Sequence, residues 1–365
     1  MISLTHFVNA AEWRIYLGSG ASKTGPGKIS VADFDGATGQ IGPVREVFSG
    51  GNPTFLASNR DQTVLYAALE NQEGSVAAWK VQKDGTLLEI NRQPTGGRGT
   101  CHVSLTPSGK WLLAADYSSG SVASFRLLED GAIGERSSHL QLTGSGPNPA
   151  RQKQPHAHGI YSDPGERHVY VVDLGTDRVW TLDLDAETGK LTFATPDSVL
   201  LTPGAGPRHL AFSKDGNHVF VNGELDLTIH SLKRNRATGE LTPVGNWPVL
   251  PREAIEENAS TAEIFVHPAG DFVTVSTRTL DALVTFAIGP NGELTKTEEM
   301  PAGVKMPRYF GFTADGSWLL AAGQNDDRVV VFQIDKASGR LIKTAHEASV
   351  PSPVAIEFIK QGGSD

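Results

Sequence analysis

Arg208, Glu224 and Arg278 carry groups that could do chemistry. Glu224 stands sixteen residues after Arg208, and Arg278 stands sixteen residues after Ala262. They belong to two copies of one repeated stretch, and a third copy places His158 at the position that Arg208 occupies. A histidine can accept or release a proton near neutral pH. Guanidinium groups bind carboxylates and phosphates through paired hydrogen bonds. These residue types at matching positions therefore predict a site that recognises an anion and transfers protons.

The same two positions can be followed through the other copies of the repeat. Six residues before the Pro-Ser-Gly or Lys-Asp-Gly turn stand Thr54, Cys101, His158, Arg208, Ala262 and Arg308. About ten residues after that turn stand Glu70, Asp116, Asp173, Glu224, Arg278 and Gln324. The start of one strand and the end of its antiparallel partner lie at the same end of a sheet. We therefore expect both sets to meet on one rim.

Simple pairing between these charges is the alternative to a functional site. In that interpretation the arginines neutralise carboxylates of neighbouring repeats, and Asp116 and Asp173 absorb some of the positive charge. Three arginines and a histidine nevertheless exceed what Glu224 alone needs for pairing. The excess favours a site that binds an anion.

Two histidines at a spacing of two, His156 and His158, stand in the most unusual stretch of the chain, RQKQPHAHG. On a regular strand they would share one face and could chelate a metal ion. Arg151 and Lys153 beside them would repel a divalent cation, and the register offers no further histidine or cysteine. We therefore expect no metal and no other cofactor. A structural pair, with both rings bonded to nearby backbone, is the other alternative.

The repeat that carries these positions consists of four short strands and occurs about seven times, at a spacing of roughly 46–57 residues. Asp84-Gly85 and Asn291-Gly292 are among the hairpin turns between the strands. One copy of this length cannot bury its apolar face alone, so neighbouring copies must stack. We predict an all-β fold, a seven-bladed β-propeller that forms a single domain over residues 1–365. An open β-solenoid is the alternative.

The first copy, which starts near Trp13, lacks an innermost strand of its own. The sequence SPVAIEF at 352–358 has the character of such a strand, yet no further copy follows it. We predict that this C-terminal strand joins the first blade, because that pairing closes the ring and removes an exposed sheet edge.

Composition limits location and partners. The net charge of −9 argues against binding of nucleic acid or an anionic membrane, and no segment approaches the roughly 20 apolar residues of a membrane span. Met1–Arg14 contains His6, Asn9 and Glu12 and lacks the pattern of a secretory signal. Cys101 is the only cysteine, which excludes an intrachain disulfide and fits a reducing compartment. We expect a cytoplasmic protein, with a monomer favoured.

Several motifs spread over nearly the whole chain resemble those of the propeller-type lactonase family. They are QPHAH at 154–158, GAGPRH at 204–209, NGEL at 222–225, STAEI at 260–264 with His267-Pro268, and AAGQ at 321–324. That family includes cycloisomerase-type 6-phosphogluconolactonases and carboxy-muconate lactonising enzymes. The resemblance implies a seven-bladed propeller without metal. It also implies a catalytic site of one histidine, one glutamate and two arginines, which map onto His158, Glu224, Arg208 and Arg278.

Two positions depart from the family's pattern. Where many relatives read Asn-Glu-Leu and Asn-Arg-Gly, this chain reads Gly223-Glu224-Leu225 and Thr277-Arg278-Thr279. The functional side chains keep their register while the neighbouring asparagines are lost.

The resemblance implies hydrolysis of a sugar lactone, with 6-phosphogluconolactone opened to 6-phosphogluconate. Either Glu224 or His158 would take the proton from the attacking water, and the other would donate one to the ring oxygen. Arg208 and Arg278 would stabilise the oxyanion or hold a carboxylate. The residues expected to contact the small anionic substrate are Arg151, His156, Arg308 and Gln324, with Arg308 or Arg151 reaching its phosphate.

Two other functions remain open at this stage. A muconate-type cyclase uses the same kinds of group to add a carboxylate across a double bond. A non-catalytic propeller that binds proteins is the second, since the fold alone does not fix function. Such a scaffold would expose apolar patches on a rim, whereas the predicted rim is polar and cationic.

Overall fold

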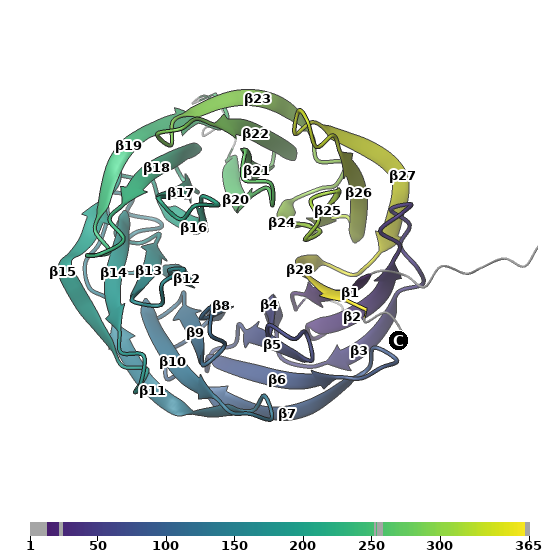
Figure 1. The fold of residues 1–365 in the computed structure, drawn as a ribbon, viewed down its shortest axis with the longest axis horizontal. Helices are drawn as coiled ribbons and strands as arrows, with labels where there is room; N and C mark the ends of the chain where they lie inside the picture. The colour runs from purple at the N-terminus through teal and green to yellow at the C-terminus, as the bar shows by residue number, and fades with distance from the viewer. Residues whose placement is uncertain (1–12, 22–24, 252, 254–257, 362–365) are drawn as a thin grey trace, which may run out of the picture.

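Twenty-eight strands in seven sheets of four make up the regular structure of the described chain. The computed structural model describes residues 13–21, 25–251, 253 and 258–361. Viewed down its shortest axis, the molecule is a ring of seven blades around a central axis (Figure 1). The prediction of a seven-bladed β-propeller is confirmed. Residues 1–12, most of the stretch searched for a secretory signal, lie outside the described part.

The blades follow one another along the chain, each with its innermost strand first, except for blade 1. Blade 1 consists of β28 (Pro353–Lys360), β1 (Trp13–Ser19), β2 (Lys28–Phe34) and β3 (Arg45–Ser49). Blades 2 and 3 consist of β4 (Pro53–Ser58), β5 (Val64–Leu69), β6 (Ser75–Val81), β7 (Leu87–Pro94), and β8 (Thr100–Leu105), β9 (Trp111–Asp116), β10 (Ser121–Leu127), β11 (Ile133–Gln141). Blades 4 and 5 consist of β12 (Ala157–Ser162), β13 (His168–Asp173), β14 (Arg178–Leu184), β15 (Leu191–Leu200), and β16 (Pro207–Phe212), β17 (His218–Gly223), β18 (Thr228–Arg234), β19 (Leu241–Pro248). Blades 6 and 7 consist of β20 (Ser260–Val266), β21 (Phe272–Arg278), β22 (Ala282–Ile288), β23 (Leu294–Pro301), and β24 (Pro307–Phe312), β25 (Trp318–Gly323), β26 (Arg328–Ile334), β27 (Leu341–Ser349).

The ring is closed by the two ends of the described chain. β28 pairs antiparallel with β1, from Trp13 opposite Lys360 to Ser19 opposite Pro353. In Figure 1 the yellow β28 lies beside the purple β1 at the inner edge of blade 1. The predicted closure by the C-terminal strand is confirmed.

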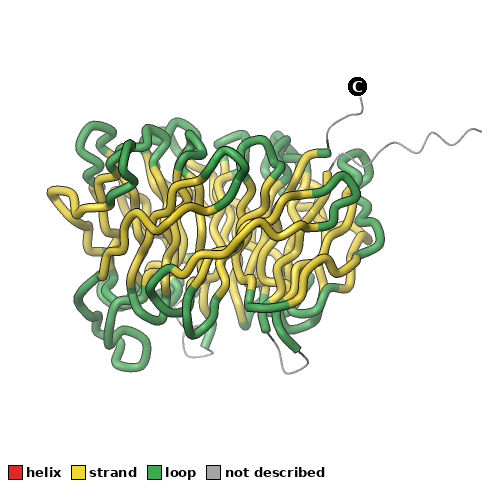
Figure 2. The backbone as a smooth tube through the Cα atoms, turned by 90° about the horizontal axis from the view of Figure 1, so that it is seen from below, coloured by secondary structure: helices red, strands yellow, loops and turns green. Residues whose placement is uncertain are grey.

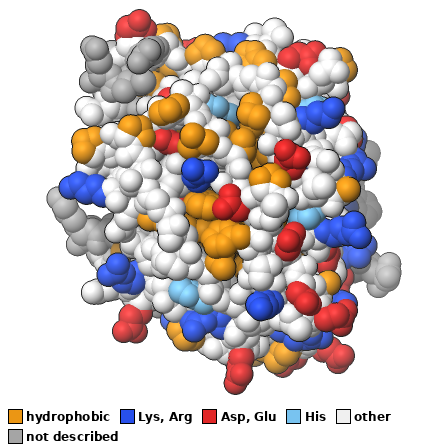
Figure 3. Space-filling model, turned by 90° about the vertical axis from the view of Figure 1, so that its left-hand side faces the viewer, with side chains coloured by type: hydrophobic (Ala, Val, Ile, Leu, Met, Phe, Trp, Pro, Cys, Tyr) orange, Lys and Arg blue, Asp and Glu red, His pale blue; other side chains and the backbone are white. Residues whose placement is uncertain are grey.

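The sequence of each strand reflects its distance from the axis. The second strands are sandwiched between neighbouring blades, so β5 (VLYAAL) and β13 (HVYVVD) are buried at every residue. The outermost strands cover only one face, and β27 alternates between half-buried and exposed side chains along much of its length. The left-hand outer wall mixes both charges with small apolar areas (Figure 3), and β15 contributes the exposed Phe193 and Leu200 to the surface.

Tyrosines on second strands tie neighbouring blades together. The hydroxyls of Tyr66 and Tyr170 donate to the carbonyls of Gly131 and Gly239, at 3.0 and 2.8 Å, in turns of the next blade. Both glycines have positive φ, 84° and 72°, which a hairpin turn requires and other residues adopt at a cost.

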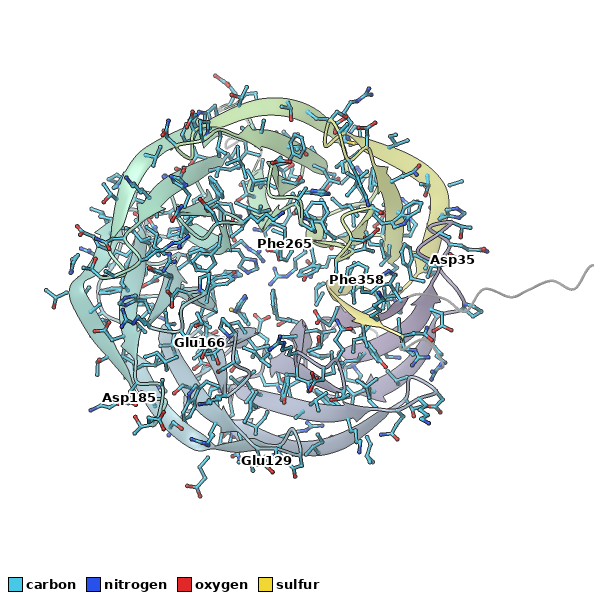
Figure 4. The ribbon with its side chains drawn as sticks, in the orientation of Figure 1. Asp35, Glu129, Glu166, Asp185, Phe265 and Phe358 are labelled. Atoms are coloured by element: carbon cyan, nitrogen blue, oxygen red, sulfur yellow. The ribbon has the colours of Figure 1, made fainter. Side chains whose placement is uncertain are left out.

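The strands run through the thickness of the ring, so the loops collect on its two opposite faces (Figure 2). Phe265 and Phe358 lie beside the axis, whereas Asp185 and Glu129 lie at the periphery (Figure 4). Among the described residues no helix is long and apolar enough to span a membrane. The two faces and the axis therefore provide the positions in which a site can form.

The closing strand also contacts the second blade through a partly buried carboxyl group. Oε1 of Glu357 on β28 accepts hydrogen bonds from the backbone N–H and the hydroxyl of Ser58 on β4, at 3.0 and 2.6 Å. Burial raises the pKa of Glu357 to about 7. Its ionisation is therefore linked to the stability of the closed ring.

Replacement of Glu357 by glutamine is expected to stabilise the protein at alkaline pH. The unfolded-state pKa of a glutamate is about 4.3, so the raised value in the fold makes ionisation oppose folding increasingly until the pH has passed about 7. With these two pKa values, the difference in the free energy of unfolding between Glu357→Gln and the wild type should shift in favour of the variant by about 2–3 kcal/mol from pH 5 to pH 8. Guanidinium chloride unfolding at both pH values measures this. Glu129→Gln, at the exposed periphery, should show no such pH dependence.

Candidate active site

A β-bulge near the start of each innermost strand turns one side chain toward the rim. In β12, Ala157 pairs with Asp173 and Gly159 with Val172, which leaves His158 as the extra residue. In β16, Arg208 is extra in the same way. A bulge re-aims the side chain of its extra residue. The bulged positions around the ring are Val354, Thr54, Cys101, His158, Arg208, Ala262 with Glu263, and Arg308.

The second set of rim residues follows the ends of the second strands. Gly223, the last residue of β17, pairs with Pro207 just before the bulge, so Glu224 is the next residue on the rim. The equivalent residues in the other blades that begin with their innermost strand are Glu70, Tyr117, Leu174, Arg278 and Gln324. All lie sixteen residues after the opening position of their blade.

The expectation that Asp116 and Asp173 are rim residues that neutralise arginines is wrong. Both are fully buried and lie one residue earlier than the rim position. Asp116 accepts hydrogen bonds from the hydroxyls of Thr95, Thr100 and Ser121 at 2.8, 2.6 and 3.1 Å. Asp173 accepts from the backbone N–H of His156, the hydroxyl of Thr176 and the indole of Trp180. Each aspartate stands fifteen rather than sixteen residues after the opening position of its blade. Its side chain is therefore buried, where it holds a loop in place.

Glu224 is the centre of an ion cluster that brings together three blades. Its carboxylate lies 2.8 Å from Nη2 of Arg151, 3.2 Å from Nε of Arg208 and 3.0 Å from Nη2 of Arg278. Burial would raise the pKa of this carboxyl, but the positive charges of Arg278, Arg208 and Arg151 outweigh it and lower the pKa to about 2. Glu224 is therefore a permanent carboxylate at neutral pH.

Arg208 and Arg278 are held rigidly at the rim. Arg208 is 2% exposed and donates through Nη1 to the carbonyl of Ala262, while Nη2 of Arg278 donates to the carbonyl of Thr261 at 3.1 Å. Burial, with Arg308 and Arg278 nearby, lowers the pKa of Arg208 to about 10. Nε of Arg278 is buried and has no hydrogen-bond partner among the described residues. It is a buried donor without an acceptor in the described part of this structure.

His158 lies beside this cluster as a neutral imidazole. Burial, and then the positive charge of Arg208, hold its pKa well below the usual value. Its Nδ1 has no hydrogen-bond partner among the described residues. The ring of Tyr117 lies edge-on at 5.4 Å between centroids, and that of His209 lies at 5.0 Å. An unprotonated nitrogen next to fixed guanidinium groups is suited to accept a proton.

A layer of buried rings forms the floor below the rim. His102 and His209 are buried, and the ring centroid of Phe55 lies 4.2 Å from that of His102 and 5.8 Å from that of His209. Nδ1 of His209 lies 2.6 Å from Oε1 of Glu263, a residue that sequence reasoning did not assign to the site. Burial raises the pKa of Glu263 to about 8. The floor therefore adds no fixed negative charge at neutral pH.

The four predicted contact residues lie around the rim. Arg151 is bonded to Glu224 and to the hydroxyl of Tyr117, and His156 stacks on Tyr117 with ring centroids 4.5 Å apart. Arg308 and Gln324 are half-buried in blade 7. No carboxylate among the described residues lies within ion-pair distance of Arg308. Arg308 is close enough to Arg208 for its charge to lower the pKa of Arg208.

The two histidines considered for zinc have different partners in the structure. The bulge at His158 breaks the regular alternation that would put both rings on one face. Nδ1 of His156 bonds to the carbonyl of Tyr117 at 2.9 Å instead. No group of three metal-ligating side chains occurs within the described ranges.

Tyr117 is a rim residue, in contact with the predicted site residues, that the sequence analysis missed. Its ring contacts both histidines, and its hydroxyl lies 3.1 Å from Nη2 of Arg151. The constant spacing of sixteen, applied from Cys101 as it was from Arg208, would have selected Tyr117 in place of Asp116.

The comparisons with known proteins agree with this fold. The family model described as "Lactonase, 7-bladed beta-propeller" matches residues 14–358. The 6-phosphogluconolactonase of Bacillus subtilis is 34% identical over 318 residues, which cover 85% of this chain and 88% of the relative. The 6-phosphogluconolactonase of Formosa agariphila is 29% identical over 353 residues, which cover 94% and 99%. The solved structure of the periplasmic gluconolactonase of Pseudomonas aeruginosa has a TM-score of 0.87 at 28% identity and covers 96% of this chain and 99% of its own.

This chain belongs to the lactonase family of seven-bladed β-propellers. The membership confirms the prediction of a lactone-hydrolysing enzyme. It sets aside the alternative of a non-catalytic scaffold.

Removal of the Glu224 charge is expected to destabilise the protein strongly, because three guanidinium groups would lose their shared counter-charge. Breaking a buried ion pair costs about 3–5 kcal/mol, and Glu224→Gln should lower the free energy of unfolding near pH 7 by a similar amount. The pKa of Glu224 is lowered in the fold, so its stabilising effect is complete above the unfolded value of about 4.3 and is lost as the pH falls toward about 2.

Chemical unfolding near neutral pH and near pH 3 checks this prediction. The difference between wild type and Glu224→Gln should shrink at the acidic value. Glu240→Gln, an exposed residue in the same blade, is the control and should change stability by less than about 0.5 kcal/mol. Equal stability of Glu224→Gln and wild type at neutral pH would contradict the ion cluster.

Proposed function

We propose that this protein hydrolyses 6-phosphogluconolactone to 6-phosphogluconate with the rim residues His158, Arg208, Glu224 and Arg278. The excess of positive charge on the rim is the observation that carries the proposal. Four guanidinium groups, of Arg151, Arg208, Arg278 and Arg308, stand against two carboxylates, Glu224 and Glu70. That leaves two positive charges, which a phosphate dianion would neutralise. The Bacillus and Formosa relatives carry the name of this activity.

Arg308 is the residue best placed to receive the phosphate. Its guanidinium is half-buried and lacks an ion-pair partner among the described residues, yet its charge lowers the pKa of both Arg208 and Arg278. A half-buried cation beside like charges and without a counter-ion attracts an anion, and a bound phosphate supplies one. Arg151, at the more exposed side of the rim, can reach the same phosphate.

His158 is the base in the proposed mechanism. It removes a proton from a water molecule that attacks the lactone carbonyl, since its imidazole is already neutral. Glu224, with a pKa of about 2, is too weak a base for this step. Its carboxylate instead fixes the guanidinium groups, and the free Nε of Arg278 together with Arg208 stabilises the oxyanion that forms at the carbonyl.

The proposal extends to the setting of the reaction. Its product is an acid of carbohydrate metabolism in the pentose phosphate pathway, and the sequence-based expectations of a cytoplasmic monomer are part of the same proposal. The Pseudomonas relative is periplasmic by name. Fractionation of cells of the source organism followed by immunodetection tests the location, and light scattering tests the monomer.

Substrate comparison tests the function. Wild-type enzyme should hydrolyse 6-phosphogluconolactone with a much higher kcat/KM than unphosphorylated gluconolactone, and should not cyclise carboxymuconate. Arg308→Ala should lose about 10–100-fold in kcat/KM on the phosphorylated lactone only, because one charge-assisted contact is removed. Arg92→Ala, which removes an arginine paired with Glu89 on the outer wall, is the control and should keep wild-type values. Equal use of both lactones by the wild type would contradict a phosphate requirement.

His158→Asn should reduce kcat about 100-fold or more if His158 is the base. Because its pKa lies well below the usual 6.5 of histidine, the wild-type kcat/KM should remain level from about pH 8 down to about pH 6.5 and fall only in more acidic solution. A pH profile of initial rates measures both. His139→Asn, an exposed histidine on the outer strand β11, is the matched control. An acid limb centred above pH 6.5, the usual pKa of histidine, would count against His158.

A further inference from the structure

The proposed mechanism does not yet assign the group that protonates the ring oxygen. When the ring C–O bond breaks, the electron pair stays on the ring oxygen, which must be protonated to leave as a sugar hydroxyl. Glu224 is ionised at neutral pH and has no proton to give. The imidazolium that His158 becomes after taking the proton of the attacking water is one source of this proton. A second group on the same rim with a proton to give would let His158 act as the base alone.

Tyr117 occupies the rim position that Glu224 occupies two blades further on. It follows β9 as Glu224 follows β17, sixteen residues after the opening position of its blade. The side chain is half-buried, so its hydroxyl is neither sealed in the core nor free in bulk solvent.

Three contacts hold the Tyr117 ring in one orientation. His156 stacks on one face at 4.5 Å and 21° between the ring planes, and its Nδ1 bonds to the Tyr117 carbonyl at 2.9 Å. His158 lies edge-on at 5.4 Å and 79°. The hydroxyl accepts a hydrogen bond from Nη2 of Arg151 at 3.1 Å, and the same Nη2 also contacts Glu224 at 2.8 Å. The phenol proton itself has no acceptor among the described residues.

We propose that Tyr117 is the proton donor to the leaving ring oxygen, with Arg151 stabilising the phenolate that results. This inference rests on the proposed lactone hydrolysis. His158 takes one proton from water as the new C–O bond forms. The ring C–O bond then breaks, and the ring oxygen takes the phenol proton. Transfer of the water-derived proton from His158 back to the Tyr117 phenolate restores both residues, and the net change is the addition of one water.

The electrostatics of the site suit this role. Burial raises the pKa of Tyr117, so the phenol stays protonated at neutral pH until an alkoxide, a stronger base, is generated beside it. Arg151 acts in the opposite direction and stabilises the anion once it has formed. The nearby imidazolium of His158 supplies the proton that ends the cycle.

Tyr117→Phe is the direct test, because it removes only the hydroxyl and keeps the ring that stacks on His156. On 6-phosphogluconolactone kcat should fall about 100-fold or more with little change in KM, as expected for loss of a general acid. Tyr170→Phe is the matched control, since it removes a tyrosine hydroxyl that bonds to Gly239 between blades 4 and 5, away from the rim. It should lower the thermal stability and leave kcat unchanged.

A change of leaving group separates a proton donor from a positioning residue. In the 5-thio analogue of the phosphorylated δ-lactone the leaving atom is a thiolate, whose conjugate thiol has a pKa of about 8.5 and needs little protonation. Tyr117→Phe should therefore lose less than about tenfold in kcat on the thiolactone. An equal loss on both lactones, or no loss on either, overturns the proposal and leaves the lactonase function intact. Inactivity of the wild type on both lactones overturns the proposed function instead.

Discussion

Closure of the ring is the constraint on which the site depends. The side chains that meet Glu224 come from the loop before blade 4, the innermost strand of blade 5 and the second strand of blade 6, and none is its neighbour in the sequence. They converge only because every blade points its innermost strand at one axis, and pairing of β28 with β1 keeps that axis in place. A repeated bulge in each innermost strand then turns one side chain per blade toward the rim.

Two buried glutamates of this region have pKa values shifted in opposite directions. Glu224 and Glu263 are both 2–3% exposed, yet the pKa of the first is lowered to about 2 and that of the second is raised to about 8. The difference lies in the partners: three guanidinium groups surround Glu224, whereas the closest partner of Glu263 is the neutral His209. The site thus holds a permanent anion at the rim, which organises the arginines, above a floor that is uncharged at neutral pH.

The rim also shows how a repeat can serve both stability and chemistry. In blades 3 and 4 the residue at spacing fifteen is an aspartate that satisfies loop donors, and its buried hydrogen bonds fix the loop from which the next residue projects. In blade 3 that next residue is Tyr117. Asp116 therefore contributes to the site through the position of its neighbour and has no direct contact with the arginines among the described residues.

The sequence by itself determined the fold class, the number of blades, closure by the C-terminal strand and the family, because strand patterns, turn residues and motifs are local properties that recur along the chain. It also selected His158, Arg208, Glu224 and Arg278 as one group, which the structure brings together. The tertiary structure showed that Tyr117 and not Asp116 is the rim residue, a distinction that the sequence spacing contained but that strand patterns did not reveal, because a shift of one residue at the end of a strand moves a side chain between the core and the rim. Only the tertiary structure assigned a carboxylate to Glu224 and a neutral imidazole to His158, because ionisation depends on burial and on charges that distant segments bring within a few ångströms.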